Sequence, residues 1–196
     1  MDEVVRRAMQ RWPNVPAVYG WLRLDRRGDW LIKTPDDRFE RIVNSAMVEF
    51  IGRNYTRDPL GRWHFQNGPQ CVFVTLEYTP WVYRLDRTVS GFTTHTGLPP
   101  KSLRRLFLDE FDGLLLETEL GIGVLSDRDL PAVLEQIDAP DGSNIEATLL
   151  VVADGEEASV QLFGRDVRIG PIRMQEVPER FRFVAVPAPA PGQPDC

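Results

Sequence analysis

Carboxylates are the side chains of this sequence with the clearest potential for chemistry. Glu117, Glu119, Asp127 and Asp129 lie on either side of Gly121-Ile122-Gly123. Acids at alternate strand positions point to one face, where a pair could bind a divalent ion or exchange protons with a substrate. A solvated strand face has the same pattern, and neither an EF-hand motif nor an opposing histidine accompanies it. We therefore retain Glu117, Glu119 and Asp127 as weak acidic-site candidates and predict no metal site.

Histidines and cysteines form no catalytic or zinc-binding motif. A Ser or Cys nucleophile needs a base within reach, and structural zinc needs ligands in closely spaced pairs. His64, His95, Cys71 and Cys196 are scattered along the chain. We interpret His64 as a residue on the polar face of a strand, His95 as a locally hydrogen-bonded residue and Cys71 as a core residue. The sequence predicts no catalytic residue and no cofactor.

The aromatic segment from Gly61 to Leu85 predicts a hairpin followed by a bend. Trp63 and Phe65 alternate with polar residues, as in a strand with one buried face. Asn67-Gly68 accepts the positive φ angles of a tight turn, and Pro80 ends the return strand because it has no N–H to donate. Beyond this bend, Trp81, Tyr83 and Arg84 are the predicted interaction surface for a ligand or partner.

Apolar periodicity predicts the remaining helices and strands. Helices are expected after Asp2, after Asn44 or Ser45, from Pro99-Pro100 with Leu103, Leu106, Phe107 and Phe111 facing inward, and after Asp129. Strands are expected at 18–24, 30–33, 89–94, 114–116, 122–125, 147–152, 158–163, 167–169 and 180–185, with Asp154-Gly155 as the turn between 147–152 and 158–163.

The two halves of the chain show a similar order of elements. We predict an α+β fold of two strand-strand-helix-strand-strand units with mostly antiparallel sheets, fused by internal duplication. The pairs that suggest it are Gly20 with Gly113, Gly28 with Gly121, Asn44 with Asp129, and Gly68 with Gly155. The predicted ranges are 1–96, which includes an N-terminal helix, 97–185, and a disordered Pro-rich tail at 186–196, with an interface near 86–100. A chance match of common elements is the alternative.

Charge and composition limit the classes of function. The 196 residues have a net charge of −6, with 14 Lys and Arg against 11 Asp and Glu in residues 1–96, and 9 against 18 in residues 97–196. This balance argues against a dedicated nucleic-acid binder, although the Arg- and aromatic-rich first half keeps single-stranded nucleic acid as an alternative. No apolar run approaches a membrane span, and the N-terminus has no signal-peptide pattern. We expect a cytoplasmic protein.

The first half resembles bacterial proteins of uncharacterised function. The resemblance covers roughly residues 13–96 and rests on Gly20–Leu24, Gly28–Trp30, Gly61–Trp63, Gly68-Pro69, Val72–Val74 and Tyr78–Val82. These segments are similar to proteobacterial families built on domains of unknown function. A related family of this kind implies repeated sheet-and-helix motifs in a two-part fold and a suggested role in signal transduction. It implies no catalytic residues.

A non-enzymatic regulatory or binding module is the function that we predict from the sequence. Its partner is expected to be a small ligand or a protein, not nucleic acid or a membrane, and a homodimer is an open alternative. A carboxylate- or metal-dependent enzyme acting through Glu117, Glu119 or Asp127 is the alternative function.

Overall fold

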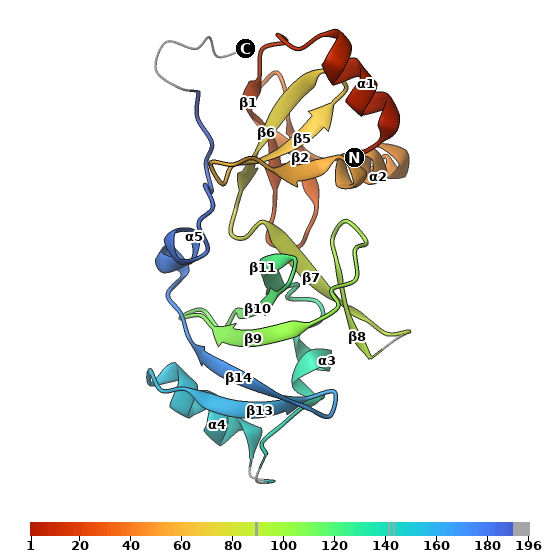
Figure 1. The fold of residues 1–196 in the computed structure, drawn as a ribbon. Helices are drawn as coiled ribbons and strands as arrows, with labels where there is room; N and C mark the ends of the chain where they lie inside the picture. The colour runs from red at the N-terminus through yellow and green to blue at the C-terminus, as the bar shows by residue number, and fades with distance from the viewer. Residues whose placement is uncertain (89, 141, 143, 190–196) are drawn as a thin grey trace. The chain divides into compact units, whose positions relative to one another are not determined.

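The structure, a computed structural model, describes residues 1–88, 90–140, 142 and 144–189. The predicted α+β class with mostly antiparallel sheets is confirmed: the chain forms two large sheets and a few short helices (Figure 1). It divides into two compact units. The first comprises residues 1–25 and 29–80 together with the described residues from Arg182 onward, and the second comprises residues 26–28 and 81–181. No helix among the described residues is long and apolar enough to cross a membrane.

The first unit contains one six-stranded sheet. Its strand order is β3-β2-β1-β6-β5-β4; β1 and β6 run parallel, and the other neighbouring strands of this order run antiparallel. The elements are α1 (Glu3–Arg11), β1 (Val18–Leu24), β2 (Trp30–Lys33), β3 (Phe39–Arg41), α2 (Ser45–Arg53), β4 (Tyr55–Arg57), β5 (Trp63–Asn67) and β6 (Gln70–Leu76). The chain therefore forms three strands, a helix and three more strands, after an N-terminal helix.

Aromatic side chains make up much of the core of the first unit. Trp30 contacts Tyr55 edge-on, and Tyr55 lies 4.8 Å from Trp63 between ring centroids. The Tyr55 hydroxyl donates to the carbonyl of Pro80 at 3.0 Å, and burial raises the pKa of Tyr55. Helix α2 begins where the sequence predicts, since the Asn44 side chain accepts from the backbone N of Met47 at 3.0 Å.

The second unit contains one eight-stranded sheet. Its order is β12-β13-β14-β9-β10-β11-β7-β8, with β14 parallel to β9 and β11 parallel to β7. The elements are β7 (Trp81–Asp86), β8 (Gly91–Thr94), β9 (Leu103–Leu108), β10 (Leu114–Thr118), β11 (Gly121–Leu125), α3 (Leu130–Leu134), β12 (Ile137–Asp138), α4 (Ile145–Ala153), β13 (Ala158–Leu162), β14 (Arg165–Pro171), the 3₁₀ turn η1 (Met174–Glu176) and α5 (Val177–Arg180).

Both sheets contain the same strand order. From β3 to β4 the first sheet reads 3-2-1-6-5-4, and the segment from β11 to β12 of the second reads 11-10-9-14-13-12. In each, the first and last strands of the series form the parallel pair, and a helix follows the third strand. The second unit adds β7 and β8 beside β11, and α4 between β12 and β13.

Three predicted elements in the second half are wrong. The segment predicted as a helix after Pro99-Pro100 is strand β9, which is paired on both sides, so sheet pairing overrides its helical spacing. The segment predicted as strand 147–152 is helix α4, capped by Asn144, whose side chain accepts from the backbone N of Glu146. A short apolar run fits either element, and the cap decides here. The predicted strand 180–185 begins instead as the end of α5.

The glycine pairs proposed from spacing do not hold equivalent positions. Gly113 ends the β9–β10 turn, whereas Gly20 lies within β1, and Gly155 follows α4, whereas Gly68 lies in a hairpin turn. The equivalent hairpin in the second sheet turns at Phe163-Gly164. Asn44 and Asp129, each predicted to start a helix, directly precede α2 and α3. Val89, Cys196 and most of the predicted tail, residues 190–196, lie outside the described residues.

Candidate functional site

Strand β7 places its aromatic side chains inside the second unit. Trp81 is 6% exposed and Tyr83 is fully buried, so these two side chains form no exposed surface. The strand fits because β11 carries a glycine opposite it: a Cβ on Gly123 would lie 2.5 Å from Tyr83 Cε2 and 2.7 Å from the carbonyl O of Trp81. Arg84 is half-buried and donates to the carbonyl of Arg27 at 2.9 Å.

These aromatic residues hold the turn between β10 and β11. Trp81 Nε1 donates to the carbonyl of Leu120 at 2.8 Å, and the Tyr83 hydroxyl lies 2.7 Å from Thr118 Oγ1 and 3.0 Å from the carbonyl O of Gly121. Burial raises the pKa of Tyr83 to about 12, so the phenol stays neutral as a hydrogen-bond partner. The predicted interaction residues Trp81 and Tyr83 thus position a turn.

Glu119, at the tip of that turn, fixes the loop that precedes β9. Its carboxylate accepts from the backbone N of Lys101, and from the backbone N and hydroxyl of Ser102 at 2.9 and 3.0 Å. Burial raises the pKa of Glu119, but these hydrogen bonds outweigh it and lower the pKa to about 2. The carboxylate is therefore ionised at neutral pH and holds residues 101–102 in place.

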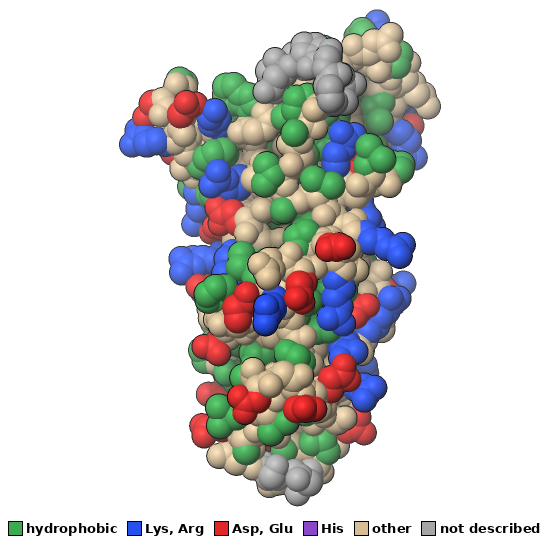
Figure 2. All heavy atoms as spheres, turned by 90° about the vertical axis from the view of Figure 1, so that its left-hand side faces the viewer, with side chains coloured by type: hydrophobic (Ala, Val, Ile, Leu, Met, Phe, Trp, Pro, Cys, Tyr) green, Lys and Arg blue, Asp and Glu red, His purple; other side chains and the backbone are tan. Residues whose placement is uncertain are grey.

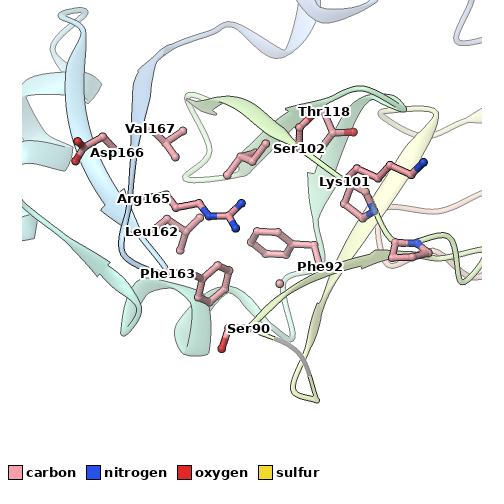
Figure 3. A pocket seen from close by; sticks show the side chains of 14 residues that line it. Ser90, Phe92, Lys101, Ser102, Thr118, Leu162, Phe163, Arg165, Asp166 and Val167 are labelled. Carbon is pink, nitrogen blue, oxygen red and sulfur yellow. The ribbon is translucent and has the colours of Figure 1, made fainter.

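A cavity of about 510 Å³ opens beside this loop (Figure 3). Its walls are β8, the loop before β9, the end of β10 and the β13–β14 hairpin. The lining residues are Ser90, Gly91, Phe92, Pro99, Pro100, Lys101, Ser102, Leu103, Thr118, Leu162, Phe163, Arg165, Asp166 and Val167. Strand β8 is at one edge of the sheet, yet its Phe92 ring lies 5.5 Å from the Phe163 ring in the hairpin turn. The sheet therefore curls, and the cavity lies between its ends.

Phe163 adopts a backbone conformation that is uncommon for an aromatic residue. Its φ is 52°, and that of Gly164 is 71°, as in the two-residue turn with two positive φ angles that favours Asn-Gly. A residue with a Cβ is disfavoured in this region by roughly 1–2 kcal/mol. The strained position directs the Phe163 ring at the cavity, where it contacts Phe92.

Arg165 supplies the cavity with positive charge. In Figure 3 its guanidinium extends from the hairpin toward Phe92, whereas the carboxylate of Asp166 points away. Asp166 instead accepts from Gln161 Nε2 at 3.1 Å. Within residues 1–88, 90–140, 142 and 144–189, neither Arg165 nor the ammonium of Lys101, which also lines the cavity, forms an ion pair. An uncompensated guanidinium beside two aromatic rings suits an anionic group attached to an apolar body.

The three acidic candidates have different neighbours and do not share a site. Glu119 anchors the 101–102 loop, and Asp127 forms an ion pair with Arg27 at 2.9 Å, whose hydrogen bond lowers the pKa of Asp127. Glu117 lies on β10, half-buried, opposite Arg105 and Ile122 in the register of the sheet. Among the residues that the structure describes, no group of three or more His, Cys, Asp or Glu could hold a metal ion.

The histidines and Cys71 occupy packed positions. His95 is 8% exposed, its Nδ1 accepts from the backbone N of Val82, and burial together with the charge of Arg84 lowers its pKa to about 3. His64 stacks edge-on against Phe73, and burial lowers its pKa. Burial raises the pKa of the Cys71 thiol to about 11, which disfavours the nucleophilic thiolate.

The residues that line the cavity were not among the predicted site residues. Phe92, Phe163 and Arg165 come from segments far apart in the sequence, which only the curl of the sheet brings together. One local signal was present: Phe163-Gly164 lies between two strand-like segments and marks a hairpin turn with an unusual aromatic residue. Nothing local connects that turn with Phe92.

Two solved structures are similar to this chain. No curated protein matches the chain. A DUF1285 family protein from Silicibacter pomeroyi DSS-3 is similar in structure, with 15% identity, a TM-score of 0.49, and coverage of 90% of this chain and 98% of that one. A DUF1285 family protein from Shewanella baltica OS155 has 14% identity, a TM-score of 0.41, and coverage of 63% and 93%.

The predicted resemblance to bacterial families of unknown function is confirmed. The model of the DUF2944 family, described as "Protein of unknown function (DUF2946)", matches residues 1–188, nearly the whole chain. The chain therefore belongs to this family of proteins of unknown function.

Proposed function

We propose that the protein is a non-enzymatic binding module whose second unit takes a small organic anion with an apolar part. The observation that carries this proposal is the Arg165 guanidinium, which extends into a cavity walled by Phe92 and Phe163 and has no acidic partner among the described residues. Arginine is well suited to a carboxylate or phosphate because its donors match both oxygens of such a group.

The shape of the cavity supports a small ligand. Its volume of about 510 Å³ falls within the range of small-molecule sites, roughly 300–1,000 Å³. Phe92, Leu162 and Phe163 are apolar lining residues, and Ser90 and Ser102 are polar ones. A ligand would bury its apolar body against the rings and direct its anionic group at Arg165.

A binding role has more support than catalysis. Cys71 has a raised pKa, and His95 is buried away from the cavity lining. The weak acidic candidates have separate partners or positions, and Glu119 is engaged in holding a loop. The proposal includes a regulatory role in the cytoplasm and in signal transduction, as expected from the sequence.

Thermal denaturation with matched probes tests the ligand class. Benzoate, phenyl phosphate and octanoate are compared with the neutral benzyl alcohol and octanol. We expect the anions to raise the melting temperature of the full chain, because a ligand that binds only the native state stabilises it by mass action. Equal effects of the neutral probes, or none with any probe, would overturn the proposal.

Two arginines on β14 provide a matched pair of variants. Arg165→Gln removes the guanidinium from the cavity, whereas Arg168→Gln changes an arginine that is 71% exposed and lies 3.6 Å from Glu157. We expect Arg165→Gln to weaken benzoate binding at least about tenfold, which corresponds to about 1.4 kcal/mol. Arg168→Gln should leave it unchanged. Equal binding by both variants would exclude Arg165 as the anion-binding group.

We also propose that the two sheets descend from one duplicated unit. The shared strand order, the parallel pair at the same place in each and the helix after the third strand support it. Separate alignments of relatives across residues 18–76 and 103–171 test the proposal. Significant similarity between the two profiles is expected, and profiles no more similar than unrelated sheets of this order would contradict it.

A further inference from the structure

Helix α4 is more apolar than its place on the surface requires. Its sequence, Ile145 to Ala153, carries apolar residues around most of its circumference. A helix of this kind is normally buried, yet Val152 is its one fully buried residue among those described. Leu150 is 66% exposed and Val151 47% exposed. The described residues thus leave part of the apolar surface of α4 uncovered.

A groove runs along α4 in the second unit. Its volume is about 450 Å³, and it lies between the sheet, α3 and α4. Leucines form its floor and walls: Leu108, Leu114, Leu130, Leu134, Leu149 and Leu150. Among the described residues that line it, the charged ones are the acids Asp112 and Glu146, and none is basic.

Acidic residues continue beside the groove. A neighbouring hollow shares Leu108, Asp112 and Ala153 with it. Among the described residues, this hollow adds the acids Asp109, Glu110, Asp154 and Glu176 and the base Arg173. Figure 2 shows acidic and hydrophobic side chains next to each other over the lower part of the face it presents. An apolar floor with an acidic margin is complementary to an amphipathic segment with basic residues along its polar side.

We propose that this groove docks a basic amphipathic helix of a partner protein. The leucines would receive apolar residues spaced at i, i+3, i+4 and i+7, and Asp112 and Glu146 would face Lys or Arg at the edges of the helix. Helix α4 has nine residues and is about 14 Å long, so two to three turns of the partner would lie against it. The groove and the anion cavity are lined by different residues, so the two proposals stand independently.

Binding of designed peptides tests the docking site on the full chain. The probe is a fluorescent 14-residue leucine–lysine helix, and its control is the leucine–glutamate helix with the same leucine positions. Fluorescence anisotropy should show saturable binding of the basic peptide that weakens as salt rises, because charge attraction is screened. The acidic peptide should bind at least about tenfold more weakly, a difference of about 1.4 kcal/mol.

Exposed leucines provide matched variants that do not disturb the core. Leu150→Asn changes the groove, and Leu60→Asn removes a leucine that is 70% exposed in the first unit. The basic peptide should lose affinity for Leu150→Asn and keep it for Leu60→Asn. Glu146→Gln should reduce affinity and its dependence on salt. Circular dichroism checks that each variant is folded.

Three results would overturn the docking proposal. The first is no saturable binding of the basic peptide, and the second is equal binding of both peptides. The third is self-association of the chain, seen by sedimentation, that Leu150→Asn abolishes, since a second copy would then be the occupant of the groove.

Discussion

The β5–β6 and β13–β14 hairpins hold the same place in the strand orders of their sheets but differ in use. The second strand of each hairpin, β6 or β14, forms a parallel pair with the first strand of its six-strand order, β1 or β9. In the first unit the turn lies near α1, with a Cβ on Gly68 3.9 Å from that of Ala8. In the second unit the turn carries Phe163, which lines the cavity with Phe92.

Aromatic content therefore does not indicate which hairpin has a function. Trp63 and Phe65 are buried in the core of the first unit, where their rings pack on Tyr55 and Phe50. The second hairpin, residues 158–171, has a single aromatic residue, Phe163, which occupies a strained turn beside a cavity. Position beside a cavity, not the number of rings, distinguishes the candidate site.

The largest expected effect on stability comes from removing one phenylalanine from each hairpin. Phe65→Ala should reduce the free energy of unfolding by about 4 kcal/mol, because Phe65 is 5% exposed and its removal leaves a cavity. Phe163→Ala should cost about 1 kcal/mol, the scale of one aromatic pair. Urea denaturation gives both values, and equal losses would show that the two hairpins are packed alike.

A third variant separates packing from strain in the second hairpin. Phe163→Asn loses the ring but places in the turn a residue that tolerates positive φ. Its stability should be at least that of Phe163→Ala, while benzoate binding should be weakened in both.

Alanine at Gly123 tests whether β7 and its aromatic residues support the site in the second unit. The added Cβ would clash with Tyr83 and with the backbone of Trp81, so we expect a loss of about 3 kcal/mol in unfolding free energy and weaker benzoate binding. Gly170→Ala is the control, because the nearest atom there, at 2.9 Å, is the end of the flexible Arg105 side chain. Matching effects at the two positions would contradict this role of β7.

The pH dependence of stability should differ between the two units. His95 has a folded-state pKa of about 3 against an ordinary 6.5, so the unfolded chain binds more protons below pH 6.5. Stability is complete above pH 6.5 and should fall by about 2 kcal/mol between pH 7 and pH 5. The lowered pKa of His64 acts in the same direction in the first unit.

Asparagine variants assign the pH dependence to each unit. His95→Asn keeps an acceptor for the Val82 N–H and should remove most of the slope, whereas His64→Asn should remove less. Urea denaturation at pH 7, 6 and 5 measures the slopes. A wild-type slope that survives in His95→Asn would disprove the assignment to His95.

The smallest expected effect is at Glu119. Glu119→Gln weakens the hydrogen bonds to Lys101 and Ser102, and we expect a stability loss below about 1 kcal/mol because the groups are exposed. In the wild type, this contribution is present above pH 4.5 and is lost as pH falls toward the folded-state pKa of about 2. Benzoate affinity should fall less than in Arg165→Gln. Glu117→Gln is the control, and an equal effect there would refute loop anchoring by Glu119.

Local signals in the sequence predicted the first unit better than the second. Asn44 caps a helix where expected. The hairpin turn lies one residue later than predicted, at Gly68-Pro69, because Asn67 still pairs with Gln70. Strand β6 ends at Leu76, four residues before Pro80, which directly precedes β7. In the second unit, apolar runs such as Leu103–Leu108 and Ile145–Ala153 are compatible with helix or strand. Sheet pairing decides the first run, and the Asn144 cap decides the second.

The candidate site was harder to predict than the fold. Glu119 was chosen for its possible chemistry, but the structure shows it anchoring a loop, a role that depends on Lys101 and Ser102. Phe92 and Arg165 meet only because an eight-stranded sheet curls. Long-range curvature of this kind leaves no periodic pattern in the sequence.

The return of the chain to the first unit has a consequence for synthesis. Val184 forms a bridge with Arg62, and the backbone N of Leu76 donates to the carbonyl of Ala185 at 2.8 Å. These contacts join residues that leave the ribosome more than a hundred positions apart. The unit translated first is thus completed last, after the entire second unit has emerged. A ribosome that stalls within the second unit would hold a nascent chain whose first unit lacks its final segment.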